Sequence, residues 1–257
     1  ETGRPMLLLC GDETEAARLC GDLHALTGRD VTLLWRRDWQ LRPSAAASRS
    51  WEHQRLAALY AMASGQAPLV VAAIDAAVQR CVPKDVLLET VIALKVGESY
   101  PIEPLTARLT AAGYVRCQQV EGPGQFALRG GILDVFTPDS DNPYRIELFD
   151  TEVDSIRTFD LNTQRSEEHL KSVSIYPCSQ IPREHQLFAE AEKNIRAAYE
   201  KQIRKLEKKE PGTELIHQLK QREGQLLEYA GSMINIQYLE KFLHYFYEET
   251  MYIWDYM

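Results

Sequence analysis

Three short apolar runs, separated by two amphipathic stretches, constrain the fold of the first part of this chain. The runs cover residues 5–10, 31–35 and 68–74. Continuous apolar runs of this length are typical of strands that are buried on both faces of a sheet. The stretches between them, 11–28 and 50–64, carry apolar residues at helical spacing. This strand–helix–strand–helix–strand order predicts a parallel α/β domain, which we place at residues 1–96.

A different pattern follows, in which one helix precedes a series of β-type runs. We expect the helix over 102–113, with the turn signals Gly122-Pro123-Gly124 and 137–143 among the runs. The expected strands are 114–120, 125–136, 144–149, 153–159 and 172–176. Residues 97–180 are therefore predicted to form an α+β domain with a mixed antiparallel sheet and one covering helix. Inside the second run, Gly130-Gly131 is expected to permit a bulge or a close backbone approach.

The last part of the chain, residues 181–257, is predicted to be helical. Two charged helices are expected at 183–209 and 213–229, separated by Pro211-Gly212, with an attractive pair between Glu200 and Arg204. The final 20 residues are rich in aromatic side chains. Such a cluster can be a base-stacking platform. Without interleaved basic residues, packing in a core or against the first domain is the favoured interpretation.

The distribution of charge argues against a free-standing nucleic-acid binder. The net charge is −8, and residues 97–180 alone hold 7 basic and 13 acidic residues, a net −6. Neither the first nor the last part has a basic excess. Phosphate neutralisation by basic residues supplies much of the affinity of nucleic-acid binders. The acidic middle domain is better suited to meeting a protein.

Motifs of catalysis are absent from the sequence. There is no GxxxxGK[ST] phosphate loop, HExxH, GxSxG or CxxC pattern, and the six histidines are scattered. We therefore expect no catalytic residue, metal site or cofactor. No membrane span or signal peptide is expected, and the first residue is Glu1, which leads us to expect a piece of a longer protein. An odd number of widely spaced cysteines predicts reduced thiols in a cytoplasmic protein. These are Cys10, Cys20, Cys81, Cys117 and Cys178.

One part of the sequence resembles a known family. The segments that carry the resemblance are 125–136, 144–150, 152–160 and 163–166. They resemble the UvrA-interacting domain that is shared by the excision-repair helicase UvrB and the bacterial transcription-repair coupling factors (Mfd). Weaker similarity covers almost the whole chain. Residues 36–50 lack the tyrosine-rich hairpin of UvrB, so the chain is more similar to the N-terminal UvrB-like module of the coupling factors.

The resemblance implies a fold and a function. The fold would be a degenerate helicase-like domain, similar to domain 1a of UvrB, with an inserted UvrA-interaction domain and a helical part that packs back. The function would be to recruit UvrA to RNA polymerase stalled at DNA lesions, without catalysis by this chain. Double-stranded DNA, ATP and Mg belong to the longer proteins of the family. The alternatives are a UvrB-type ATP-dependent helicase subunit and a DNA-binding structural domain. We expect a bacterial cytoplasmic protein that is monomeric as this chain. In the family, the module packs against the rest of its own chain and hides the UvrA surface, so masking of the docking face is implied by the resemblance alone.

Five residues are candidates for UvrA binding by this resemblance: Arg116, Arg129, Gly130, Arg145 and Phe149. An arginine can form two parallel hydrogen bonds to a carboxylate of a partner. For Arg129, the alternative is a salt bridge within the domain, to Asp134 or Glu147. Phe149, like Phe136 and Phe159, is expected in the core, and exposure would make any of the three an interface anchor.

Overall fold

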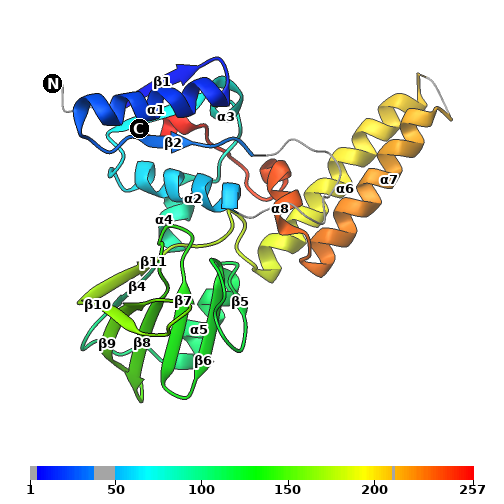
Figure 1. Ribbon diagram of the computed structural model, residues 1–257. Helices are drawn as coiled ribbons and strands as arrows, with labels where there is room; N and C mark the ends of the chain where they lie inside the picture. Colours follow the sequence, from blue (N-terminus) through cyan, green and yellow to red (C-terminus); the bar gives the residue numbers. More distant parts are fainter. Residues whose placement is uncertain (1–4, 38–49, 210–211) are drawn as a thin grey trace.

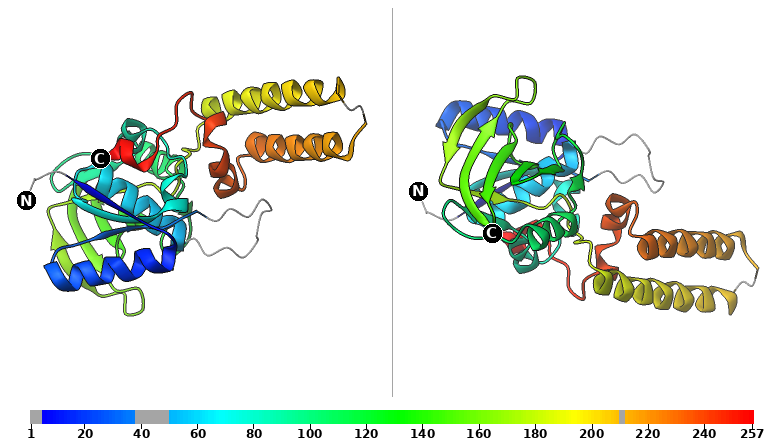
Figure 2. Two further views of the ribbon diagram at one scale, coloured as in Figure 1. Left: turned by 90° about the horizontal axis from the view of Figure 1, so that it is seen from above. Right: turned by 90° about the horizontal axis from the view of Figure 1, so that it is seen from below.

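The computed structural model describes residues 5–37, 50–209 and 212–257. It has an α/β part, a β-rich part and a long helical hairpin that extends away from both (Figures 1 and 2). Most of the segment 36–50, in which the sequence lacks the hairpin of UvrB, lies outside the described residues, as does Pro211. The domain boundaries named above remain predictions.

The predicted parallel sheet is confirmed. Its strands are β1 (Met6–Cys10), β2 (Thr32–Leu34) and β3 (Leu69–Ala73), in the order β1-β3-β2 with every pair parallel. The helices of this part are α1 (Glu13–Thr27), α2 (Ser50–Ala63), α3 (Ile74–Ala77) and α4 (Lys84–Glu89). Asp12 caps α1 by accepting a hydrogen bond from the backbone N–H of Glu15, and Gly28 ends it with a left-handed conformation.

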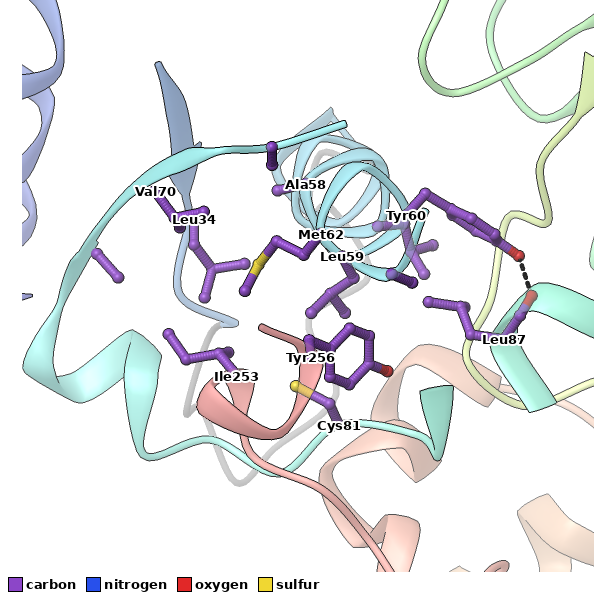
Figure 3. Packing of buried hydrophobic residues seen from close by; sticks show 14 of the residues in the cluster. Leu34, Ala58, Leu59, Tyr60, Met62, Val70, Cys81, Leu87, Ile253 and Tyr256 are labelled. Atoms are coloured by element: carbon purple, nitrogen blue, oxygen red, sulfur yellow. Dashed lines mark hydrogen bonds between the residues drawn. The ribbon is translucent and has the colours of Figure 1, made fainter. Parts of the chain in front are cut away.

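Two apolar clusters cover opposite faces of this sheet, which explains the continuous apolar runs. On one face, Ala16 of α1 packs with Val71 and Ala73. On the other face, side chains of α2 pack with the alternate strand residues and with the end of the chain. Figure 3 shows Ile253 and Tyr256 of this end beside Leu34, Leu59 and Met62. The C-terminal residues therefore complete the core of the N-terminal sheet.

The middle of the chain forms a six-stranded sheet in the order β10-β9-β8-β7-β6-β5. Its strands are β5 (Val115–Arg116), β6 (Gln125–Arg129), β7 (Ile132–Phe136), β8 (Tyr144–Phe149), β9 (Glu152–Phe159) and β10 (Ser166–Leu170). The β5–β6 pair is parallel and the other pairs are antiparallel, so the predicted mixed sheet is confirmed. The helix α5 (Ile102–Ala111) covers one face, and its Leu105 and Leu109 pack in the cluster there.

Three details of this part differ from the prediction. The run 114–120 is a strand only at Val115–Arg116. The run 125–136 is two strands, β6 and β7, joined by a turn at Gly130-Gly131. The run expected at 172–176, observed as β11 (Ser172–Ile175), pairs with β4 (Ile92–Lys95) in a separate two-stranded sheet. Pairing between segments so far apart in sequence leaves no local signal.

The helical part consists mainly of α6 (His185–Glu207) and α7 (Glu214–Ser232), which pack side by side as an antiparallel pair (Figure 2). It continues through α8 (Ile236–Leu239), η1 (Glu240–Tyr245) and, at the end of the chain, η2 (Ile253–Tyr256). Glu200 and Arg204 form the predicted ion pair at 3.0 Å. Most of the C-terminal aromatic residues are buried or partly buried among these elements, as the packing interpretation predicted. Trp254 is an exception, being exposed.

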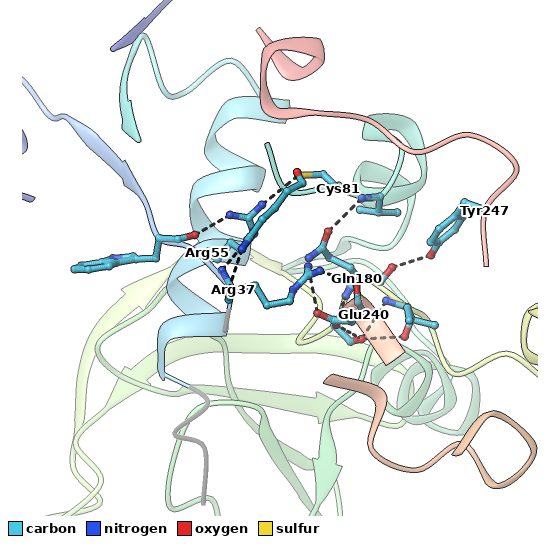
Figure 4. Close-up of polar contacts among 11 residues, drawn as sticks. Arg37, Arg55, Cys81, Gln180, Glu240 and Tyr247 are labelled. Carbon is cyan, nitrogen blue, oxygen red and sulfur yellow. Dashed lines mark hydrogen bonds and ion pairs between the residues drawn. The ribbon is translucent and has the colours of Figure 1, made fainter. Parts of the chain in front are cut away.

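A buried polar network joins the helical part to the first sheet (Figure 4). The backbone N–H of Arg37 donates to Gln79 Oε1 at 2.7 Å, and its guanidinium donates to the carbonyl of Glu240 at 2.6 Å. The Glu240 carboxylate lies 3.6 Å from Nη2 of Arg37 and accepts from the N–H of Gln180 at 2.8 Å. The hydroxyl of Tyr247 donates to the carbonyl of Gln180 at 2.7 Å. The network therefore fixes η1 against the loop that follows β2.

No helix among the described residues has both the length and the apolar character needed to cross a membrane. All five cysteines lie in the described part of the chain, and they are free thiols.

Candidate docking surface

The six-stranded sheet presents two chemically different faces. Phe126, Leu133, Ile146 and Ile156 point toward α5 and form the core with it. Successive side chains of a strand point to opposite faces, so the residues between these belong to the other face, which faces the viewer in Figure 1 with α5 behind the sheet. In the described part of the chain no helix covers this second face. We call it the open face.

Asp134 is the centre of an ionic cluster on the open face. It lies on β7, its side chain is only 2% exposed, and it accepts hydrogen bonds from two arginines. Arg145, on the neighbouring strand β8, donates through Nε to Oδ1 at 2.7 Å and through Nη2 to Oδ2 at 2.9 Å. Arg129, on β6, donates through Nη2 to Oδ2 at 2.7 Å. A buried carboxylate is tolerated because these donors compensate its charge.

Arg145 is held rigidly within this cluster. Its guanidinium lies 4.1 Å from the ring centroid of the buried Phe159, a cation–π geometry. It also donates to Gln164 Oε1 at 3.1 Å. The hydrogen bond to Asp134 raises the pKa of Arg145 above its ordinary value, although burial opposes this. Arg145 therefore acts mainly as a support for Asp134, and most of its donors are occupied within the chain.

Arg129 is both paired within the domain and accessible to solvent. The predicted salt bridge within the domain exists, to Asp134 and at 2.7 Å. The side chain of Arg129 nevertheless remains 47% exposed. A guanidinium has five N–H donors, and a single hydrogen bond to Asp134 leaves several of them directed to solvent. Arg129 can thus donate hydrogen bonds to a carboxylate of a partner while its hydrogen bond to Asp134 holds it in place.

Gly130 and Gly131 form a two-residue turn between β6 and β7, because Arg129 and Ile132 are paired in register. Of the two expected alternatives, a bulge or a close approach, the bulge is not formed, and Gly130 has a φ of 60°, which suits a tight hairpin turn. The expected close approach is confirmed at Gly131. Its carbonyl accepts from the N–H of Leu148 at 2.7 Å, and a Cβ at this position would lie 2.4 Å from the carbonyl oxygen of Leu148.

Phe149 is 83% exposed, so its expected place in the core is wrong. Alternation explains this, because Ile146 and Leu148 of β8 face the core and Phe149, one residue on, faces away from it. Phe136 and Phe159 are buried as expected. Phe149 lies beside an open groove near the hairpin turn. The groove is lined by Gly131, Ile132, Glu147, Leu148, Phe149 and Asp154.

Arg116 does not share a face with the other candidates. It is exposed on the short edge strand β5, where it pairs in register with Phe126. Phe126 belongs to the cluster on the α5 side of the sheet, and paired residues of neighbouring strands point the same way. The register therefore places Arg116 on the covered side and Arg129, Gly130, Arg145 and Phe149 around the open face.

Sequence reasoning missed Arg157 of β9, which also lies on the open face. It is paired in register with Arg145 and forms an ion pair with Glu147, which also accepts a hydrogen bond from Ser155 at 3.0 Å. The alternation in 152–159 was the signal that could have found it. The described residues contain no group of side chains that could hold a metal ion.

Comparisons with known proteins assign the part of the chain that contains this sheet to a domain family. Residues 92–180 match the UvrB interaction domain family, a range that contains every residue of the open face named above. The whole chain is 34% identical to a stretch of the transcription-repair-coupling factor of Bacillus subtilis that makes up 22% of that protein. The transcription-repair-coupling factor of Haemophilus influenzae is 35% identical over 173 residues, which are 66% of this chain and 15% of that protein.

The transcription-repair-coupling factor of Escherichia coli is 31% identical over 183 residues, which are 69% of this chain and 16% of that protein. The chain thus spans about a fifth or less of the length of the curated relatives that it matches.

Proposed function

Because the chain is homologous to part of the transcription-repair-coupling factors and contains a UvrB interaction domain at residues 92–180, we propose that it is a docking module for UvrA. The module would bind UvrA through the open face of its six-stranded sheet. In a longer protein of this kind, the module would bring UvrA to RNA polymerase stalled at a lesion. We assign ATP-driven movement, and contacts with double-stranded DNA, to other parts of such a protein.

The observation that carries the proposal is the position of Arg129. Its guanidinium is held by a hydrogen bond to the buried Asp134, and the side chain is still half-exposed to solvent. A pre-positioned arginine loses little conformational freedom when it binds a partner carboxylate. Charge-assisted hydrogen bonds of this kind are stronger than neutral ones. Arg129 therefore supports recognition of an acidic side chain of UvrA.

Phe149 is a second feature that favours the open face as the docking surface. A strongly exposed phenylalanine next to a groove is the kind of side chain that anchors a protein interface. Its ring lies at the end of β8, and the groove continues along Ile132 and Gly131. One apolar contact, from Phe149, and one oriented cation, Arg129, on the same sheet would together fix the orientation of bound UvrA. The net −6 charge of residues 97–180 disfavours a phosphate backbone as the partner of this face.

Binding of purified UvrA to the 257-residue chain and its variants tests the proposal. Arg129→Glu should keep the native secondary structure, as judged by circular dichroism, because Arg145 still pairs with Asp134, although a carboxylate beside Asp134 should lower the free energy of unfolding. It should weaken UvrA binding about tenfold to a hundredfold, as expected for loss of a charge-assisted contact. Arg108→Glu makes the same charge change on α5, behind the sheet, and should have little effect. UvrA binding by Arg129→Glu at the wild-type affinity would refute the proposal.

Arg116→Glu separates the two faces of the sheet. If UvrA docks on the open face alone, this substitution on the α5 side should change the affinity less than twofold. A loss as large as that of Arg129→Glu would mean that the interface wraps around the β5 edge.

A further inference from the structure

The hairpin of α6 and α7 extends away from both sheets, and its outer part has a surface that the proposed function does not use (Figure 2). The buried side chains of Tyr199 and Ile203 on α6 pack in one cluster with Ile216 and Leu226 of α7. Lys201 lies two residues from both Tyr199 and Ile203, which corresponds to about 200° around a helix. Lys201 therefore points away from α7, and its side chain is exposed.

This part of α6 has an excess of positive charge. Residues 196–209 hold six basic and two acidic side chains, a net charge of +4, in a chain with a net charge of −8. Both acidic side chains already have partners. Glu200 pairs with Arg204 at 3.0 Å, and Glu207 pairs with Lys220 of α7 at 3.3 Å. Four exposed lysines of this segment have no acidic partner among the described residues: Lys201, Lys205, Lys208 and Lys209.

We call these four lysines the basic face. They line a shallow groove along α6, together with Ala197, Glu200 and Arg204. From the first lysine to the last the helix rises about 12 Å, at 1.5 Å per residue. Lys201 and Lys205 are four residues apart, and like charges at this spacing destabilise a helix. A bound anionic partner would offset this repulsion, which the fold itself leaves uncompensated.

The composition of the groove indicates the kind of partner. Of the described residues that line it, none is aromatic, and Ala197 is the one apolar residue. Single-stranded nucleic acids are held by aromatic side chains on which their bases stack, so the groove lacks a main feature of such sites. A DNA duplex extends well beyond the basic face. The chain outside 196–209 has a net charge of −12, since the whole chain has −8 and this segment +4, and this charge opposes the approach of a long polyanion.

A short acidic peptide fits the basic face in both length and charge. An extended peptide advances about 3.3 Å per residue, so about four residues span the 12 Å between the first lysine and the last. Carboxylates of Asp and Glu complement the charge of the lysines. The flexible stems of the lysines allow the ammonium groups to follow carboxylates at different spacings.

We propose that the basic face binds an acidic segment of a protein partner, a short run of Asp and Glu residues. The ammonium groups of its lysines pair with the carboxylates of the segment. Because both sets of charges are exposed to solvent, the affinity depends strongly on ionic strength. This inference does not depend on the proposed docking of UvrA, since the basic face and the open face share no residue.

Fluorescence anisotropy with the 257-residue chain tests the inference. The probe is a fluorescein-labelled octapeptide of alternating Asp and Glu, and a labelled octapeptide of alternating Asn and Gln is its uncharged control. At about 20 mM salt, where the Debye length is about 20 Å, we expect saturable binding of the acidic peptide and no binding of the control. At about 200 mM salt the affinity should fall about tenfold or more, because the Debye length shortens to about 7 Å.

Two double variants separate the basic face from the net charge of the chain. Lys201→Glu combined with Lys205→Glu should weaken binding of the acidic peptide about tenfold or more. Arg18→Glu combined with Lys171→Glu makes the same change of net charge on exposed side chains away from the hairpin, and should change the affinity by about twofold or less. Circular dichroism of both variants should show the helix content of the wild type.

Competition with a DNA duplex of about 20 base pairs distinguishes an acidic protein segment from a nucleic-acid backbone. Compared per negative charge, unlabelled acidic peptide should displace the probe more effectively than the duplex. More effective displacement by the duplex would assign the basic face to nucleic acid and overturn the proposal. Absence of saturable peptide binding at low salt, or an equal loss of affinity in the two double variants, would also overturn it.

Discussion

The guanidinium of Arg129 and the carboxylate of Asp134 meet at 2.7 Å, and the two side chains differ sharply in exposure, with 47% for the arginine and 2% for the aspartate. The pair thus connects the surface of the open face to its interior. Arg145 binds the same carboxylate from the neighbouring strand. Phe159 and Gln164 therefore hold Arg145, Arg145 holds Asp134, and Asp134 holds Arg129.

Asp134→Asn should lower both stability and UvrA affinity. The substitution leaves two arginines without their shared counter-charge, one of them largely buried, and removal of one partner of a buried ion pair costs about 3–5 kcal/mol. Urea unfolding measures this loss. Asp141→Asn, in the exposed turn before β8, is the control and should change the unfolding free energy by less than about 0.5 kcal/mol. Equal unfolding free energies of Asp134→Asn and the wild type would contradict the proposed role of Asp134.

Phe149→Ala should weaken UvrA binding without weakening the fold. An exposed ring contributes little to folding, whereas truncation of an aromatic anchor in an interface costs about 2 kcal/mol or more. Surface plasmon resonance measures the affinity, and thermal unfolding measures the stability. Phe159→Ala provides the contrast, because loss of this buried ring should destabilise the fold by about 3–5 kcal/mol. Unchanged UvrA affinity in Phe149→Ala would remove Phe149 from the interface.

Gly131→Ala should destabilise the chain more than Gly130→Asn. A Cβ at position 131 would lie 2.4 Å from the carbonyl oxygen of Leu148, so the backbone of β8 must move. Overpacking of this kind costs about 1–3 kcal/mol. Position 130 has no atom within 4 Å of an added Cβ and a φ of 60°, which asparagine tolerates. Denaturant unfolding compares the two variants, and equal stability would argue against the close approach.

Arg37→Met should destabilise the chain far more than Arg36→Met, although the residues are neighbours. Arg37 and Glu240 are both buried, and the substitution leaves the Glu240 carboxylate without its counter-charge, at a cost of about 3–5 kcal/mol. Arg36 forms its ion pairs with Glu13 and Asp75 at the surface, where such pairs contribute about 0–1 kcal/mol. Thermal unfolding gives the comparison. Similar melting temperatures of the two variants would mean that the network is not needed to hold η1.

Local sequence patterns predicted many of the elements, because the repeat of apolar residues reflects burial directly. The three runs of the first sheet and the two helices of the hairpin were found from it. The strand β4 was not, since its partner β11 is far away along the chain. For Gly130-Gly131 the sequence left a bulge and a close backbone approach open, because glycine permits both conformations.

The candidate site, like the fold, could be predicted from the sequence only in part. The resemblance placed Arg129, Gly130, Arg145 and Phe149 around what the structure shows as one open face. It also included Arg116, whose pairing with Phe126 directs it to the other side of the sheet. The exposure of Phe149 and the support of Arg129 by Asp134 depend on strand register and on the packing of α5, which contacts of distant segments determine.

The residue pattern alone specified the alternation of each strand, the acidic charge of residues 97–180 and the position of their arginines along the chain. Alternation separates two faces of a sheet, but it does not say which face is covered. The packing of α5 against one side settles this and leaves Arg129 and Phe149 on the other side. Because burial of apolar area is non-directional, the covered side of the sheet depends on where the helix packs.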